Sequence, residues 1–176
     1  ITTYEMLEAQ RAAARYGRLT SVHHRFHPNA STPTEGPTGA NEIIVNAMLL
    51  DAPLQIHHNN DYGWWEIEEK LQLARAKGLN MWSEYYPYAA GATAVTADFL
   101  KPSEWVEKRG YKYEDTIFDP IDNAFLTNET YAALMKKEPG RSVVIVFPYR
   151  KPWLKDFLTI PHMTIAADAM VGVGPD

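Results

Sequence analysis

Two adjacent histidines follow a short apolar run in segment 53–60, which reads Pro-Leu-Gln-Ile-His-His-Asn-Asn. An apolar run of this length, bounded by proline and by polar residues, is typical of a buried strand. Histidine at a strand end can ligate a metal through neutral imidazole or exchange a proton near neutral pH. The pair His57 and His58 therefore indicates a metal or acid–base site, with a hydrogen-bonded core histidine as the alternative for one of the two.

Alternating helices and strands are predicted around this pair. A capping-box pattern at Thr2 and Glu5 begins the first helix, which ends near Gly17. Further helices are predicted over 40–50, 64–77, 127–137 and 152–158, with shorter ones over 93–100 and 103–109. Strands are predicted over 19–23, 53–58, 80–86, 142–147 and 163–167. This alternation with short connections is typical of a parallel sheet with helical crossovers.

Polar and aromatic side chains stand at the ends of the predicted strands. Because parallel strands share a direction, their carboxyl ends meet at the same edge of the sheet. We therefore expect His23, His58, Tyr86 and Asp168 to converge there. An α/β barrel and an open doubly wound sheet would both bring them together. For Asp168, capping of a following helix is the structural alternative.

The composition is that of an ordinary globular protein, with 45% hydrophobic and 22% charged residues among 176. With a net charge of −5 and no basic run, the chain is not expected to bind nucleic acid. Cysteine is absent, which excludes disulfides and cysteine ligands within the chain and favours a cytoplasmic location. No apolar run approaches the roughly 18–20 residues of a membrane-spanning helix, so no membrane association is expected.

Four segments carry a family resemblance. Segment 22–25, Val-His-His-Arg, is similar to the motif Thr-His-Met-Arg, and segment 55–60, Gln-Ile-His-His-Asn-Asn, is similar to Gln-Ile-Ser-His-Leu-Lys. Segment 86–93, Tyr-Pro-Tyr-Ala-Ala-Gly-Ala-Thr, is similar to Tyr-Pro-Tyr-x-Ala-Gly-Ser-Thr, and segment 165–168, Ile-Ala-Ala-Asp, is similar to Ile-Gly-Ser-Asp. In order and spacing they resemble the D-aminoacylases, the N-acyl-D-amino-acid deacylases of the metal-dependent amidohydrolase superfamily.

The resemblance implies an α/β fold that is part of a (β/α)₈ TIM-type barrel, about strands four to eight with their helices. Residues 1–176 would form a C-terminal-half portion of the barrel, with an irregular insertion at about 101–126. It also implies a divalent metal, zinc above all, with His58 and Asp168 as ligands. Asp168 would in addition be the catalytic acid and base. His23, Arg25, Tyr86 and Tyr88 would bind the substrate.

The implied activity is hydrolysis of the amide bond of an N-acyl (D-)amino acid, or a related small molecule, by a metal-activated water. One alternative is a degenerate barrel that binds without catalysis, because the motif lysine is Asn60 here and no His-x-His pair is present. A second alternative is a cyclic amidase of the dihydroorotase or hydantoinase type.

The chain is also expected to be a fragment of a larger barrel. It begins at Ile1, directly before a helix, and both ends look cut from something longer. An open parallel sheet would leave exposed edges that favour aggregation. We therefore expect the rest of the barrel, or a partner chain, to cover these edges.

Overall fold

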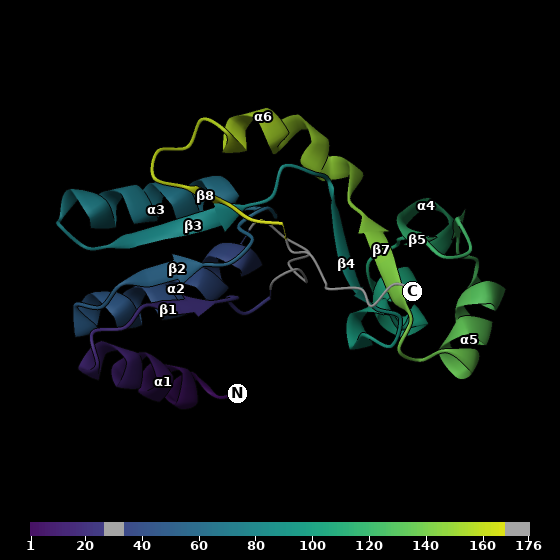
Figure 1. Ribbon diagram of the computed structural model, residues 1–176, viewed down its shortest axis with the longest axis horizontal. Helices are drawn as coiled ribbons and strands as arrows, with labels where there is room; N and C mark the ends of the chain where they lie inside the picture. The colour runs from purple at the N-terminus through teal and green to yellow at the C-terminus, as the bar shows by residue number, and fades with distance from the viewer. Residues whose placement is uncertain (27–33, 168–176) are drawn as a thin grey trace, which may run out of the picture. The chain divides into compact units, whose positions relative to one another are not determined.

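The computed structural model describes residues 1–26 and 34–167 and divides into two compact units (Figure 1). The first unit comprises Ile1–Pro87 and Lys155–Ala166. The second comprises Tyr88–Leu154 and, among the described residues, Ala167. None of the described helices is long and apolar enough to cross a membrane.

A parallel four-stranded sheet forms the first unit, in the order β1-β2-β3-β8. Its strands are β1 (Thr20–Val22), β2 (Leu54–Ile56), β3 (Met81–Tyr85) and β8 (Thr164–Ile165). The helices α1 (Thr3–Arg15), α2 (Glu35–Leu50) and α3 (Trp64–Ala76) connect or precede the first three strands, and the short α6 (Leu154–Phe157) follows the second unit in sequence. The predicted βαβ pattern is confirmed for β1, β2 and β3, which pair in parallel.

The core of the first unit lies between the sheet and its helices. Ile43 and Ile44 of α2 and Leu71 of α3 pack against Leu54 and Ile56 of β2, and all five are at most 4% exposed. In the part of the chain that the structure describes, these helices cover one face of the sheet. The other face carries polar side chains, which is where the candidate site is found.

Local sequence signals explain where the helices begin and end. Thr2 and Glu5 form the predicted capping box, in which the Thr2 hydroxyl accepts a hydrogen bond from the Glu5 amide at 3.1 Å. Gly78 ends the α3 region with a φ of +85°, a conformation that glycine adopts without steric cost. Gly63, also at +85°, is the N-cap of α3, and no side-chain hydrogen bond caps this helix.

An antiparallel sheet forms the second unit, in the order β4-β7-β5-β6. Its strands are β4 (Ala90–Ala94), β5 (Ile117–Asp119), β6 (Ala124–Phe125) and β7 (Ser142–Val146). Its helices are α4 (Tyr113–Thr116) and α5 (Asn128–Lys137), with 3₁₀ turns at Asp98–Leu100 and Pro148–Trp153 and a π-helical turn at Ser103–Lys108. Trp105, Tyr113, Ile117, Val143 and Ile145 form the centre of a separate core.

One topological prediction was wrong. The run at 142–147 does form a strand, β7, but it pairs antiparallel with β4 and β5 and belongs to the second unit. Its β-branched composition indicates a buried strand without fixing its partner or direction. The partner β4 reads Ala-Gly-Ala-Thr-Ala, which has weak strand propensity, and residues 93–100 were expected to be helical.

Candidate metal centre

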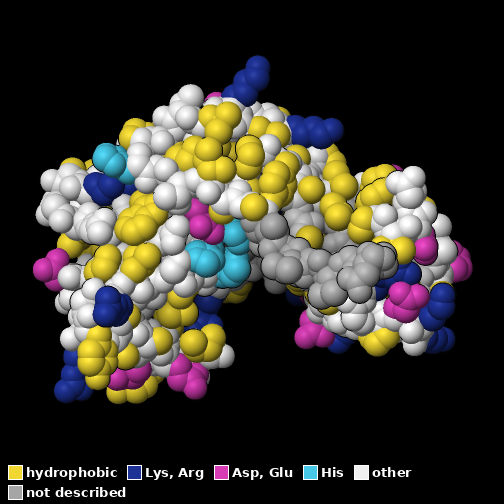
Figure 2. All heavy atoms as spheres, in the orientation of Figure 1, with side chains coloured by type: hydrophobic (Ala, Val, Ile, Leu, Met, Phe, Trp, Pro, Cys, Tyr) yellow, Lys and Arg dark blue, Asp and Glu magenta, His cyan; other side chains and the backbone are white. Residues whose placement is uncertain are grey.

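The carboxyl ends of β1, β2 and β3 bring polar side chains together on the open face of the first unit's sheet. Leu54 and Ile56 are fully buried under the helices, so the alternate residues Gln55 and His57 face the other side. Ser21 of β1 lies opposite Gln55 in the parallel register, and its hydroxyl donates to the Gln55 Oε1 at 2.8 Å. In the space-filling view, histidine side chains gather in a patch over these strand ends (Figure 2).

The left-handed backbone conformation of His58 places both adjacent histidines on this face. Strict strand alternation would send His57 and His58 to opposite sides of the sheet. His58 instead has a φ of +48°, which turns the chain back, and its ring centroid lies 5.4 Å from that of His57. The turn is attached to β3, because the backbone N–H of Asn59 donates a hydrogen bond to the backbone carbonyl oxygen of Glu84 at 2.9 Å. Such backbone strain is often found at functional sites.

Three imidazoles form a compact cluster. The ring of His23 lies 5.1 Å from that of His57 and 4.8 Å from that of His58. One nitrogen from each lies within 4.8 Å of the others. Imidazole nitrogens bind zinc at about 2.0–2.1 Å, so ligand atoms around one ion are about 3.3 Å apart. Small side-chain rotations would bring the three nitrogens onto a single ion, and among residues 1–26 and 34–167 no other group of this kind is found.

The protonation state of His23 suits metal binding. Burial, followed by the nearby charges of His57 and His24, lowers the pKa of His23 below its usual value. The neutral ring is therefore favoured, and neutral imidazole is the form that coordinates metals. His24 does not belong to the cluster, since its Nδ1 contacts the Arg25 carbonyl oxygen at 2.7 Å.

A carboxylate borders the cluster. The Oε1 of Glu84 lies 3.1 Å from the Nδ1 of His58 and 3.8 Å from the Nδ1 of His57. Its other oxygen, Oε2, accepts a hydrogen bond from the Gln55 Nε2 at 3.1 Å. Ser21 contacts the Nε2 of His57. These polar contacts connect β1, β2 and β3 at the level of the histidines.

A buried polar network supports the turn from the helix side of the sheet. Asn59 Nδ2 donates to the Tyr85 hydroxyl at 2.9 Å, and that hydroxyl and the one of Ser83 donate to Glu68 Oε2 at 3.3 and 3.2 Å. The other Glu68 oxygen pairs with Arg75 at 2.7 Å. Burial, followed by the charge of Glu68, raises the pKa of Tyr85, so its hydroxyl stays protonated and able to donate.

Replacing Tyr85 with phenylalanine is expected to lower the free energy of unfolding by about 1–3 kcal/mol, because Asn59 and Glu68 would lose a buried partner. Urea denaturation followed by circular dichroism measures the change. Tyr16→Phe is the matched control, since Tyr16 is 74% exposed and its replacement should change stability by less than about 0.5 kcal/mol. Equal effects of the two substitutions would show that the network adds no stability.

The sequence-predicted site residues divide into those in the cluster and those outside it. His58 and His23 lie in the cluster, and the ring of Tyr86, which is 2% exposed, lies 5.4 Å from that of His58. Arg25 is paired with Glu42, with Nε and Oε2 2.5 Å apart. Tyr88 is 37% exposed and belongs to the second unit. Asp168 lies outside the described residues, so its predicted role stays a prediction.

The sequence analysis had not named His57 individually as a ligand and had given Glu84 no role. The pair was expected to mark a site, but only His58 was named as a ligand, because His58 is the position that matches the family motif. For Glu84, the available signal was its place on a strand: it lies one residue from the buried Tyr85 and two from Tyr86. Alternation therefore puts Glu84 on the open face.

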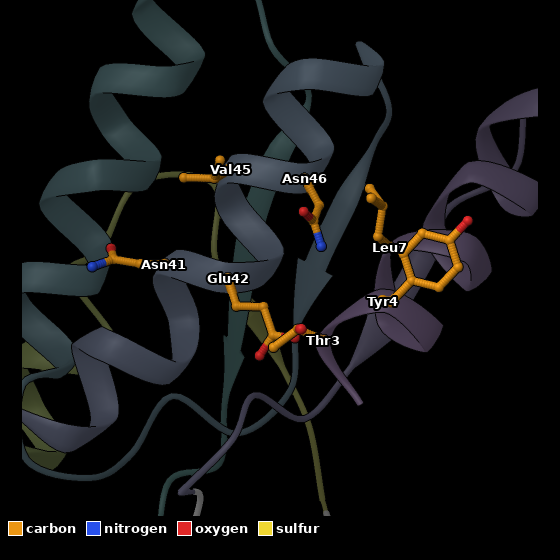
Figure 3. A pocket seen from close by; sticks show the side chains of 7 residues that line it. All are labelled: Thr3, Tyr4, Leu7, Asn41, Glu42, Val45 and Asn46. Carbon is orange, nitrogen blue, oxygen red and sulfur yellow. The ribbon is translucent and has the colours of Figure 1, made fainter. Parts of the chain in front are cut away.

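A shallow groove lies elsewhere in the first unit, on its helical layer, between α1 and α2 (Figure 3). It is lined by Thr3, Tyr4, Leu7, Asn41, Glu42, Val45 and Asn46. Its one charged side chain, Glu42, is already paired with Arg25. The groove offers no group of metal ligands, so the strand ends are the stronger candidate site.

No protein-family model and no curated protein sequence matches the chain. Among solved structures, N-acyl-D-glutamate deacylase from Bordetella bronchiseptica, complexed with zinc and a phosphonate inhibitor, matches 96% of the chain with a TM-score of 0.67 and 12% identity. A crystal structure of D-aminoacylase matches 95% of the chain with a TM-score of 0.64 and 18% identity. In fold, the chain is similar to the D-aminoacylases. The resemblance predicted from the four motifs is confirmed at this level.

The likeness extends over part of those proteins only. The chain covers 36% of the N-acyl-D-glutamate deacylase and 35% of the D-aminoacylase. A second D-aminoacylase structure, described by its binuclear metal centre, matches with a TM-score of 0.62 and 16% identity over 95% of the chain. The mixed α/β fold thus corresponds to about a third of a D-aminoacylase-type structure.

Proposed function

We propose that this chain is part of a metal-dependent hydrolase that cleaves the amide bond of an N-acyl amino acid, with D-amino-acid derivatives as the first substrates to test. The observation that carries the proposal is the cluster of His23, His57 and His58 at the ends of two parallel strands. The fold likeness to D-aminoacylases supports the same reaction class.

The residues present fit a divalent metal. Three imidazoles suit zinc, and also copper, iron and nickel, better than calcium or magnesium, which prefer oxygen ligands. His23, His57 and His58 would hold the ion, which moves His23 from its expected substrate contact to metal binding. When bound, the metal would supply a Lewis acid for the substrate carbonyl and a water nucleophile at neutral pH.

Other side chains are proposed to handle the proton and the substrate. Asp168, by its place in the family motif, would complete the metal site, take the proton of the water and deliver it to the leaving amine. Tyr86 lies beside His58 and would line the substrate position, as would Tyr88. Arg25 would reach a substrate carboxylate only by giving up its ion pair with Glu42.

Further strands are proposed to complete the barrel. Within the described residues, β1 and β8 are the edges of the first unit's sheet. Unpaired edges readily accept another strand. We propose that strands from another part of the protein, or from a partner chain, pair with β1 and β8. The polar face with the histidines would then line the barrel interior.

The activity test uses N-acetyl-D-glutamate, its L enantiomer and a neutral N-acetyl-D-amino acid, with release of the free amine as the readout. The zinc-loaded protein is expected to hydrolyse at least one of these compounds. Dialysis against a chelator should reduce the rate to background, and added zinc should restore it, because metal-activated water is the nucleophile.

Two outcomes would contradict the proposal in different ways. Zinc binding without hydrolysis of any N-acyl compound would favour the non-catalytic alternative, in which the barrel binds ligands but has lost catalysis. Hydrolysis that persists after removal of all metal would contradict a metal-dependent mechanism.

A further inference from the structure

We propose that Glu84 is a fourth ligand of the metal site, which makes the site a set of three imidazoles and one carboxylate. This inference rests on the proposed function in one respect: it takes the histidine cluster to hold a divalent cation. Neither the motifs nor the fold comparison assigns a role to Glu84.

The sheet register places Glu84 at the level of the histidines. Ile56 of β2 lies opposite Ser83 of β3, so the next residues along the two strands, His57 and Glu84, are neighbours. The backbone N–H of Asn59 donates a hydrogen bond to the backbone carbonyl oxygen of Glu84 at 2.9 Å. This bond keeps the two strands together beyond the end of β2. Glu84 therefore stands on a rigid element, as a ligand must if it is to be positioned accurately.

The distances from Glu84 to His57 and His58 are close to those expected between ligands that share one ion. Zinc bonds of about 2.0–2.1 Å in tetrahedral geometry put neighbouring ligand atoms about 3.3 Å apart. The Glu84 Oε1 lies 3.1 Å from the His58 Nδ1 and 3.8 Å from the His57 Nδ1, so the two separations bracket this value. The group of ligand atoms that lie within 4.8 Å of one another comprises His23, His57 and His58 without Glu84, so a shared ion requires the Glu84 side chain to move toward the three histidines.

The carboxylate is also held in the required orientation. Gln55 donates from its Nε2 to the Glu84 Oε2 at 3.1 Å, and Gln55 is itself held by the Ser21 hydroxyl at 2.8 Å. With Oε2 engaged, Oε1 is directed at the imidazoles. Such hydrogen bonds to a ligating carboxylate are typical of metal sites.

Charge favours a ligand role as well. The Glu84 side chain is 13% exposed and that of His58 is 8% exposed, so both lie largely away from water. Neutral imidazoles leave the charge of a divalent ion uncompensated, and a carboxylate ligand beside them would offset part of that charge.

Cobalt(II) is the probe for the test, because its visible absorption bands report the ligands around it. Wild-type protein and the Glu84→Gln variant would each be titrated with Co²⁺, and zinc affinity would be measured by competition. We expect Glu84→Gln to shift the cobalt bands and to weaken zinc binding by at least about 100-fold, the upper end of what loss of an orienting group costs. Glu69→Gln, at an exposed carboxylate of α3, should leave both unchanged.

The outcomes separate this inference from the function on which it rests. If the wild-type protein binds no Co²⁺, the metal site itself is wrong and both proposals fall. If Glu84→Gln keeps the wild-type cobalt spectrum, Glu84 only orients His58, and the inference fails while the metal site stands. If Glu84→Gln binds too little cobalt to give a spectrum, Glu84→Ala with added acetate decides. Acetate-dependent binding with wild-type-like bands supports a ligand role, and indifference to acetate overturns it.

Discussion

The His58→Asn variant is expected to bind zinc at least about 100-fold more weakly than the wild-type protein, because it removes an imidazole ligand from the cluster. The backbone of His58 is in the left-handed conformation, with a φ of +48°. Asparagine is chosen because it tolerates that conformation better than most residues. The backbone turn should therefore persist while the ligand is lost. Isothermal titration with Zn²⁺ measures the affinity.

The matched control is His162→Asn. His162 also has a positive φ, 62°, but it is exposed and lies outside the histidine cluster. This substitution should leave zinc affinity unchanged. An equal loss in both variants would mean that zinc binds unspecifically to exposed histidines, and an unchanged affinity in His58→Asn would remove His58 from the site.

The Gly39→Ala variant is expected to be destabilised by about 1–3 kcal/mol or more, because the added methyl group would clash where two backbone segments lie close together. A Cβ at Gly39 in α2 would lie 2.2 Å from the Arg25 carbonyl oxygen, and Arg25 closely follows His23 in the segment after β1. Backbone cannot yield as a flexible side chain can. Either α2 or the segment that carries His23 must shift, so zinc binding should weaken as well.

Gly140→Ala serves as the control for this prediction. A Cβ at Gly140 would meet nothing within 4 Å, so this change should be close to neutral. Thermal and urea denaturation of the two variants, together with zinc titration, make the comparison. Equal stability of the Gly39 and Gly140 variants would show that the contact between α2 and Arg25 is not maintained in solution.

The elements of the first unit were largely predictable because their signals are local. The Thr2 capping box and Gly78 each act within a few residues, and the apolar run before His57 marks β2 without reference to the rest of the chain. The second unit was less predictable because its strand pairing is not local. Its β7 joins β4, about 50 residues earlier in sequence, and no local signal encodes that partner.

The site was predicted in part for a similar reason. The end of β2 was recognised from residue types, and His58 was expected there. His57 was not named as a ligand because the family motif matches His58, and the left-handed backbone conformation of His58 that brings both rings to one face cannot be predicted from the residue type. Glu84 acquires its significance only through the β2–β3 register, which brings it beside residues 26 and 27 positions earlier.

The most direct test of the account is to locate zinc in crystals of the zinc-loaded protein by anomalous scattering at the zinc edge. We expect one strong peak among His23, His57 and His58, about 2.0–2.1 Å from their coordinating nitrogens. A peak at another place in the chain, or no peak at these three histidines, would contradict the metal centre and with it the proposed hydrolase.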